Sequence, residues 1–157
     1  MNQSKFVKIS DVDLTVVSNS LRTAIATLVS FFVARTLKMP EFYWAPISTI
    51  VIMQSTINPV QGAWQRFVGT ALGAILGAVF ATFVGRTVAI YALGIFLCGI
   101  LAAMLRAWSA YRVTAITFSI VVLISRGPGW SFALHRFIEV SIGIAVALVA
   151  MLIWKGK

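Results

Sequence analysis

Four arginines lie within or beside long apolar segments, where a guanidinium group is costly unless it faces protein, water or a counter-charge. They are Arg22, Arg66, Arg112 and Arg136. The chain has thirteen Lys and Arg but only four Asp and Glu, so it cannot neutralise all of these arginines by itself. Guanidinium groups bind carboxylates through paired hydrogen bonds. The pattern predicts binding of an organic anion, although Arg22 and Arg112 could equally extend to lipid headgroups.

Three further side chains could take part in this chemistry. Glu139 follows Arg136 by three residues on the same helix face, so an ion pair within the helix is the simplest interpretation. Alternatively, Glu139 and His135 could couple transport to protons, unless His135 simply lies at the membrane interface. Trp44 could stack on an aromatic ligand, although an aromatic belt at the membrane boundary also explains it. Trp44 is therefore a candidate binding residue, and His135 and Glu139 are candidates for proton coupling.

Other kinds of site find no support in the sequence. It has no phosphate-binding loop, no metal-ligand cluster and no nucleophile triad, and it has one cysteine and one histidine. The net charge of +9 is spread singly along apolar runs and is not gathered on one face, which argues against nucleic acid as a partner. We therefore expect no metal, no cofactor and no enzymatic activity.

The elements that must position these residues are membrane helices. The chain has 157 residues, a hydrophobic fraction of 60%, and a mean hydropathy of +0.96. Its charged fraction of 11% compares with about 25% in soluble domains. The sequence predicts an all-α integral membrane protein with about six transmembrane helices in a single domain, residues 1–157. The expected helices lie near residues 14–37, 41–57, 66–85, 88–106, 109–126 and 132–154.

An internal repeat appears at an offset of seventy residues. Residues 45–79 align with 115–149 without gaps and share an Arg-Phe pair followed by a glycine seven residues after the arginine. Three helices per unit would place the two units in opposite orientations, as in many transporters. We therefore expect two inverted three-helix repeats, one over about 14–85 and the other over about 88–154.

Small residues recur every four positions in the third expected helix. Gly69, Gly73 and Gly77 would let another helix backbone approach closely, so they predict helix packing within or between subunits. Loop charges suggest the orientation, because positively charged loops favour the cytoplasm. A cytoplasmic N-terminus places eight Lys and Arg inside and five outside. Both termini are therefore expected in the cytoplasm.

One segment resembles a known family. Residues 40–77, PEFYWAPISTIVIMQSTINPVQGAWQRFVGTALGAILG, contain Tyr43-Trp44-Ala45, then Arg66, then Gly69-Thr70 and a glycine-rich helix. Together with RFIEVSIGIAVALV from Arg136, this pattern resembles the fusaric acid resistance and aromatic acid exporter superfamily, which is related to the aluminium-activated malate transporters. The resemblance implies a protein of the bacterial inner membrane that exports aromatic or hydroxylated carboxylic acids.

The same resemblance bears on assembly. Many members of the superfamily are longer, and the related malate transporters are dimeric anion channels. One six-helix unit therefore favours a homodimer in the lipid bilayer, with an organic anion as substrate. Two alternatives stay open: an anion channel on the same scaffold, and a membrane subunit that anchors or regulates a partner without transporting anything.

Overall fold

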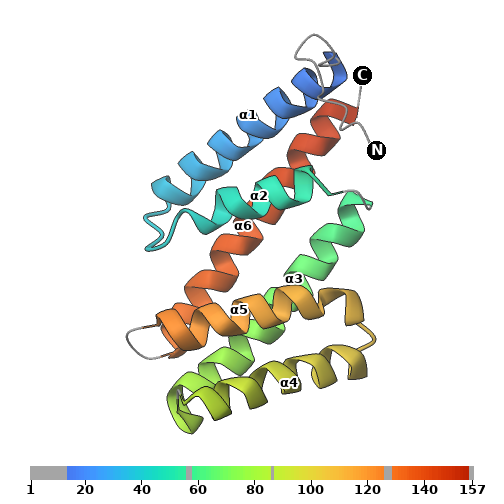
Figure 1. The fold of residues 1–157 in the computed structure, drawn as a ribbon. Helices are drawn as coiled ribbons and strands as arrows, with labels where there is room; N and C mark the ends of the chain where they lie inside the picture. The colour runs from blue at the N-terminus through green and yellow to red at the C-terminus, as the bar shows by residue number, and fades with distance from the viewer. Residues whose placement is uncertain (1–13, 56–57, 86, 126–128, 156–157) are drawn as a thin grey trace, which may run out of the picture.

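The structure, a computed structural model, describes residues 14–55, 58–85, 87–125 and 129–155. The described residues form helices without strands, which confirms the predicted all-α class (Figure 1). Residues 1–13 and 156–157, which bear on the expected orientation of the termini, lie outside the described part. The elements in chain order are α1 (Leu14–Thr36), α2 (Trp44–Met53), α3 (Pro59–Val79), the π-helical turn η2 (Phe80–Val84), α4 (Val88–Met104), the 3₁₀ turn η3 (Trp108–Ala110), α5 (Tyr111–Ile124) and α6 (Gly129–Lys155).

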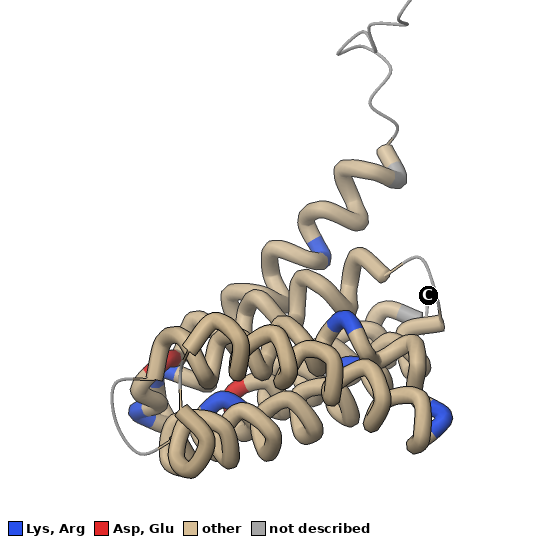
Figure 2. The backbone as a smooth tube through the Cα atoms, turned by 60° about the horizontal axis from the view of Figure 1, so that its bottom comes forward, with Lys and Arg blue, Asp and Glu red and all other residues tan. Residues whose placement is uncertain are grey.

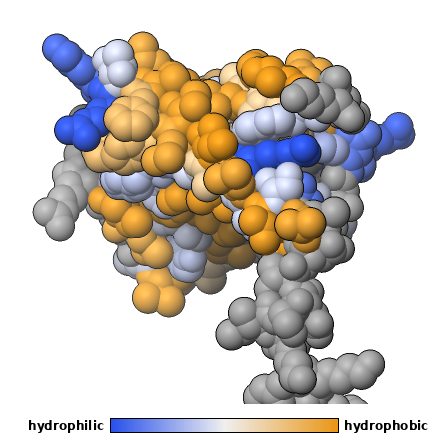
Figure 3. Space-filling view, turned by 90° about the horizontal axis from the view of Figure 1, so that it is seen from above, coloured by the Kyte–Doolittle hydropathy of each residue, from blue (hydrophilic) through white to orange (hydrophobic). Residues whose placement is uncertain are grey.

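The six helices differ in length. Three helical stretches are long and apolar enough to cross a membrane by length and composition: Val16–Thr36, Pro59–Val84 and Gly129–Trp154. The other three are shorter apolar helices, and α2 has only 10 residues, or about 15 Å of helix. Large apolar side chains such as Phe32, Trp64 and Leu152 are exposed, and apolar atoms cover much of the face in Figure 3. Such a surface suits lipid better than water.

The start of α3 differs from the prediction. The sequence predicts a helix that begins near residue 66, but α3 begins at Pro59. The Asn58 side chain accepts a hydrogen bond from the Val60 N–H at 3.0 Å, and Pro59 occupies the first helical position. This is a favourable helix start, because the first N–H groups of a helix have no acceptor within it. An asparagine before the helix supplies one acceptor, and a proline at the first position has no N–H to satisfy. This start places Arg66 two turns inside the helix.

The helices are arranged in two groups around a central pair. In Figure 1, α3 and α6 cross the middle of the molecule in opposite directions. Helices α1 and α2 pack on each other and on α6, while α4 and α5 pack on each other and on α3. The directions of α1 and α4 are opposed, as are those of α2 and α5 (Figure 1). The predicted inverted repeat requires this pattern of directions and contacts.

The ends of α1 and α4 also correspond. At the end of α1, Lys38 has a φ of 53°, and at the end of α4, Arg106 has a φ of 52°. The Lys38 N–H bonds the Arg35 carbonyl at 3.0 Å, and the Arg106 N–H bonds the Ala103 carbonyl at 3.0 Å. In both cases the next N–H reaches back five residues, which completes the usual left-handed helix ending. The offset here is 68 residues, so an alignment at seventy does not reveal it.

Close backbone contacts hold each short helix against a central one. A side chain at Gly73 of α3 would collide with the Thr114 carbonyl of α5. A side chain at Gly143 of α6 would likewise collide with the Ala45 carbonyl of α2. The Thr49 hydroxyl strengthens the second contact by donating to the Gly143 carbonyl at 3.0 Å. The short helices are therefore fixed relative to α3 and α6, and so are the side chains at their ends.

Candidate functional site

The central feature of the site is a buried guanidinium group. Arg136, in the second turn of α6, is only 3% exposed. Its Cζ atom lies 3.0 Å from the centroid of the Trp44 ring at the start of α2. An arginine over an indole face is attracted by the ring's quadrupole, which is negative at the face, by about 2 kcal/mol when both groups are shielded from water. Trp44 therefore holds Arg136 in place through its ring, and this contact leaves the N–H groups of Arg136 available for hydrogen bonds.

A network of carboxylates surrounds this pair. The Trp44 Nε1–H donates to Glu41 Oε2 at 2.7 Å, and the Glu41 backbone N–H donates to Glu139 Oε1 at 2.9 Å. Glu41 belongs to the α1–α2 connection, so these bonds tie that connection to both α2 and α6. Figure 2 shows the acidic positions of the described chain confined to one part of the molecule, beside basic ones. The site thus combines cations and anions in a largely apolar protein.

Several polar atoms of this cluster lack partners. The buried Nε and Nη1 of Arg136 and the buried Oε2 of Glu139 form no hydrogen bonds. The two side chains are one turn apart on α6, but no ion pair at 4 Å or less joins them or any other described residues, so the predicted ion pair within the helix is absent. An unsatisfied buried polar atom costs about 1–3 kcal/mol, and more when it is charged. The cluster therefore has free capacity for an anion at Arg136.

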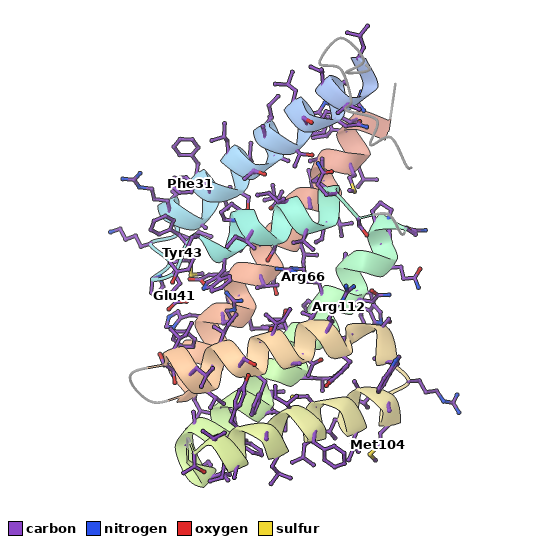
Figure 4. The ribbon with its side chains drawn as sticks, in the orientation of Figure 1. Phe31, Glu41, Tyr43, Arg66, Met104 and Arg112 are labelled. Carbon is purple, nitrogen blue, oxygen red and sulfur yellow. The ribbon has the colours of Figure 1, made fainter. Side chains whose placement is uncertain are left out.

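Arg66 lies near this cluster from the other central helix. Its Nε is buried without a partner, and its guanidinium group is close enough to that of Arg136 for the two to repel. The adjacent rings of Phe67 and Phe137 lie 5.0 Å apart between centroids. In Figure 4, Arg66 lies toward the middle of the bundle, while Glu41 and Tyr43 lie together at one end of α2. The arginines matched in the repeat are thus neighbours where α3 passes α6.

The other predicted arginines lie elsewhere. Arg22 lines a separate cavity of about 530 Å³ between the ends of α1, α2, α3 and α6. Arg112 is exposed at the start of α5, at the end of that helix away from Glu41 and Tyr43 (Figure 4). The structure therefore brings Trp44, Arg66, Arg136 and Glu139 together, and it places Arg22 and Arg112 outside this group.

His135 and the packing glycines are also placed. His135 lies one turn from Glu139, close enough for an electrostatic interaction, and its Nδ1 is 2.8 Å from the Ser131 carbonyl. Gly69, Gly73 and Gly77 all face α5, so in this chain their close contacts lie within one subunit. His135 is therefore near the cluster, whereas the glycines pack α3, the helix that bears Arg66, against α5.

Sequence reasoning did not assign a role to Glu41 or Tyr43. Glu41 forms hydrogen bonds with both Trp44 and Glu139, and Tyr43 lies between Glu41 and Trp44 in the chain. Burial and the Glu41 carboxylate raise the pKa of Tyr43 above its ordinary value, so its hydroxyl stays protonated near neutral pH. The small number of acidic residues could have pointed to Glu41. The chain has only four Asp and Glu, and a carboxylate near apolar segments is costly unless it has a partner or a function.

Comparison with known proteins gives two findings. The family described as fusaric acid resistance protein-like matches residues 25–150. The inner membrane protein YeeA of Escherichia coli (strain K12) is 31% identical over 144 residues, which cover 87% of this chain and 40% of that protein. The chain thus spans less than half the length of this relative. No solved structure matches the chain.

Proposed function

The chain belongs to the fusaric acid resistance protein-like family, and from this premise we propose that it moves organic carboxylate anions across the bacterial inner membrane. Membership supports a membrane transporter and not an enzyme. The relative YeeA is an inner membrane protein, and the exposed apolar helices of this chain suit the same location. Efflux of aromatic or hydroxylated acids is the finer form of the proposal, following the resemblance to the aromatic acid exporters.

One observation carries the proposal. Arg136 is almost fully buried, carries unpartnered N–H groups and has Arg66 beside it. Two like charges held together in an apolar protein repel, and a bound anion would relieve that repulsion. A carboxylate would also supply the missing hydrogen-bond acceptors, and the Trp44 ring could contact an aromatic body. We therefore assign the anion to Arg66 and Arg136, with Trp44 beside it.

The assembly is part of the proposal. The family resemblance extends to the aluminium-activated malate transporters, which are dimers, and on that ground the proposed working unit is a homodimer. Mass measurement of the purified protein in lipid nanodiscs tests this directly. A mass of two chains supports the homodimer, and a mass of one chain with full transport activity would exclude it.

Transport by purified protein in proteoliposomes tests the function. We expect uptake of radiolabelled 4-hydroxybenzoate above that of empty liposomes. Arg136→Gln should lower the rate roughly tenfold or more, because a hydrogen bond to a charged group is worth about 1.5–3 kcal/mol. Arg136→Lys should be intermediate, since lysine keeps the charge but lacks the guanidinium fork. Arg66→Gln should also slow uptake.

The matched control is Arg35→Gln, which removes an exposed arginine at the end of α1. This variant should transport at the wild-type rate. Size-exclusion chromatography would confirm that each variant is folded before transport is measured. Wild-type uptake by a folded Arg66→Gln, Arg136→Gln double variant would refute the assignment of the anion to these arginines.

A further inference from the structure

The cavity beside Arg22 is separate from the Arg66–Arg136 cluster and has its own chemistry. It has a volume of about 530 Å³, within the range of small-molecule sites. Arg22 is the one charged group among the described residues that line it. Amide and hydroxyl groups accompany it, among them Asn19, Thr23 and Gln54. The cavity therefore offers one positive charge and several hydrogen-bond donors.

Apolar side chains form much of the rest of the lining, which we call the apolar wall. Met53, Leu148, Met151 and Leu152 form it, together with Trp154 near the end of α6. A ligand that satisfies both walls needs a small anionic group on an apolar body. A single guanidinium suits a single negative charge, since a second charge would find no partner among the lining groups.

Gln54 fixes the polar wall. Its Nε2–H donates to the Thr23 hydroxyl at 3.0 Å, and that hydroxyl in turn donates to the Asn19 carbonyl at 2.9 Å. These bonds join the end of α2 to α1 at Thr23, the residue directly after Arg22. The position of Arg22 at the cavity therefore depends on a defined helix contact, and not on a free loop.

A buried apolar cluster separates this cavity from the inner arginines. Ile52, Ala63, Val140, Ile144 and Ala147 form the cluster, and Met53, Leu148 and Met151 pack against it from the cavity side. On its other side, Arg66 follows Ala63 by three residues and Arg136 precedes Val140 by four, or about one helical turn in each case. We call these five residues the apolar plug.

From this arrangement we propose that the cavity is a second anion-binding site, which takes a singly charged amphiphile and is closed from the inner arginines by the apolar plug. Arg22 binds the anionic group, and the methionine and leucine wall takes the apolar body. The anionic group can belong to a free organic acid or to a membrane lipid, since both present one charge on an apolar body. Binding here requires no transport, so the proposal can be tested apart from the function proposed above.

Charge-selective thiol labelling in detergent tests the site. Cys98 is the single cysteine and is fully buried, so the parent protein serves as the blank. In Ser55→Cys, a thiol lines the cavity. We expect an anionic methanethiosulfonate to modify it faster than a cationic one, by roughly threefold after correction for their reactivity toward free cysteine.

Two substitutions at Arg22 make the test specific. Adding Arg22→Gln to Ser55→Cys should abolish the preference for the anionic reagent, whereas Arg22→Lys should keep it. Arg35→Gln, an exposed arginine outside the cavity, should leave it unchanged. A preference that survives Arg22→Gln in a folded protein would overturn the proposal.

Protection experiments distinguish the two sources of the ligand. Benzoate that slows the labelling of Ser55→Cys in a saturable way would identify a free organic acid as a ligand. With a neutral methanethiosulfonate, which an anionic surface does not repel, slower labelling in nanodiscs that contain phosphatidylglycerol than in phosphatidylcholine nanodiscs would identify a lipid headgroup. Absence of protection by both, with Arg22 intact, would overturn the binding site.

Labelling of the plug tests the barrier. Ala147 belongs to the plug and is fully buried, so Ala147→Cys should react at least roughly tenfold more slowly than Ser55→Cys. Comparable labelling rates in a protein that elutes like the parent would show that the cavity is not closed from the inner arginines.

Discussion

The contact of α2 with α6 and the contact of α5 with α3 occupy corresponding places in the two halves of the molecule, yet they are built differently. Both contain a glycine against a carbonyl of the short helix, Gly143 in one and Gly73 in the other. One turn earlier, α3 has Gly69 packed on α5, whereas α6 has Glu139 bonded to the backbone of Glu41. One contact is close-packed, and the other is polar.

This difference indicates that corresponding contacts of the two repeats can have different roles, one in packing and the other in positioning charged groups. At the same offset of seventy residues, one position before the aligned segment, Trp44 corresponds to Thr114. The Thr114 hydroxyl donates to the Ala110 carbonyl, in the turn just before α5. Trp44 instead bonds Glu41 and supports Arg136. The α3–α5 contact therefore fixes the helix that bears Arg66, while the α2–α6 contact contains the charged side chains. Substitutions in the two contacts should then have different consequences.

The largest effect is expected from the close-packed contact. In Gly73→Leu, the new side chain would meet the Thr114 carbonyl and the Thr117 side chain, and backbone atoms cannot move aside cheaply. We expect a loss of several kcal/mol or failure to fold, because overpacking a tight contact costs about 1–3 kcal/mol even where side chains can adjust. Recovery of monodisperse protein and its thermal unfolding in detergent measure the effect.

Gly99→Ala is the matched control for this substitution. A side chain at Gly99 would meet only Tyr111, at an ordinary 3.4 Å. The variant should be more stable than the parent by up to about 1 kcal/mol, because Gly99 lies inside α4 and alanine favours a helix interior over glycine. If Gly73→Leu were as stable as Gly99→Ala, the contact of α3 with α5 would be looser than the structure shows.

A smaller effect is expected at Glu139 in the polar contact. Glu139→Ala removes the acceptor of the Glu41 N–H and leaves a small void, which should cost about 2 kcal/mol. Glu139→Gln keeps an oxygen at the same place and should cost less. Thermal unfolding at neutral pH compares the two. Equal losses would mean that the bond to the Glu41 backbone contributes nothing, and that the contact is held by packing alone.

The sequence predicted the helices better than the site. The expected helix near 88–106 corresponds closely to α4, whereas the one near 66–85 missed the first two turns of α3. The repeat paired Arg66 with Arg136, and the structure places the two arginines near each other. The bonds of Glu41 could not be foreseen, because they join the α1–α2 connection to a residue 98 positions away. Arg112 shows the converse, since a charge near an apolar run can simply be exposed at a helix start.

The smallest effect tests whether the two halves are equivalent away from the charged groups. Lys38 and Arg106 both adopt the left-handed conformation that favours glycine. At each position we compare glycine with alanine, because both remove the charge and differ mainly in backbone freedom. Lys38→Gly should be more stable than Lys38→Ala by about 1 kcal/mol, and Arg106→Gly should exceed Arg106→Ala by a similar amount.

Thermal unfolding of the four variants measures these differences, and Ala24 supplies the control. Ala24 is exposed in the interior of α1, so Ala24→Gly should instead lower stability by about 1 kcal/mol. Equal gains at the two helix ends would strengthen the view that α1 and α4 are copies of one unit. A gain at only one end would mean that the shared left-handed geometry is local, because copies under the same constraint should respond alike.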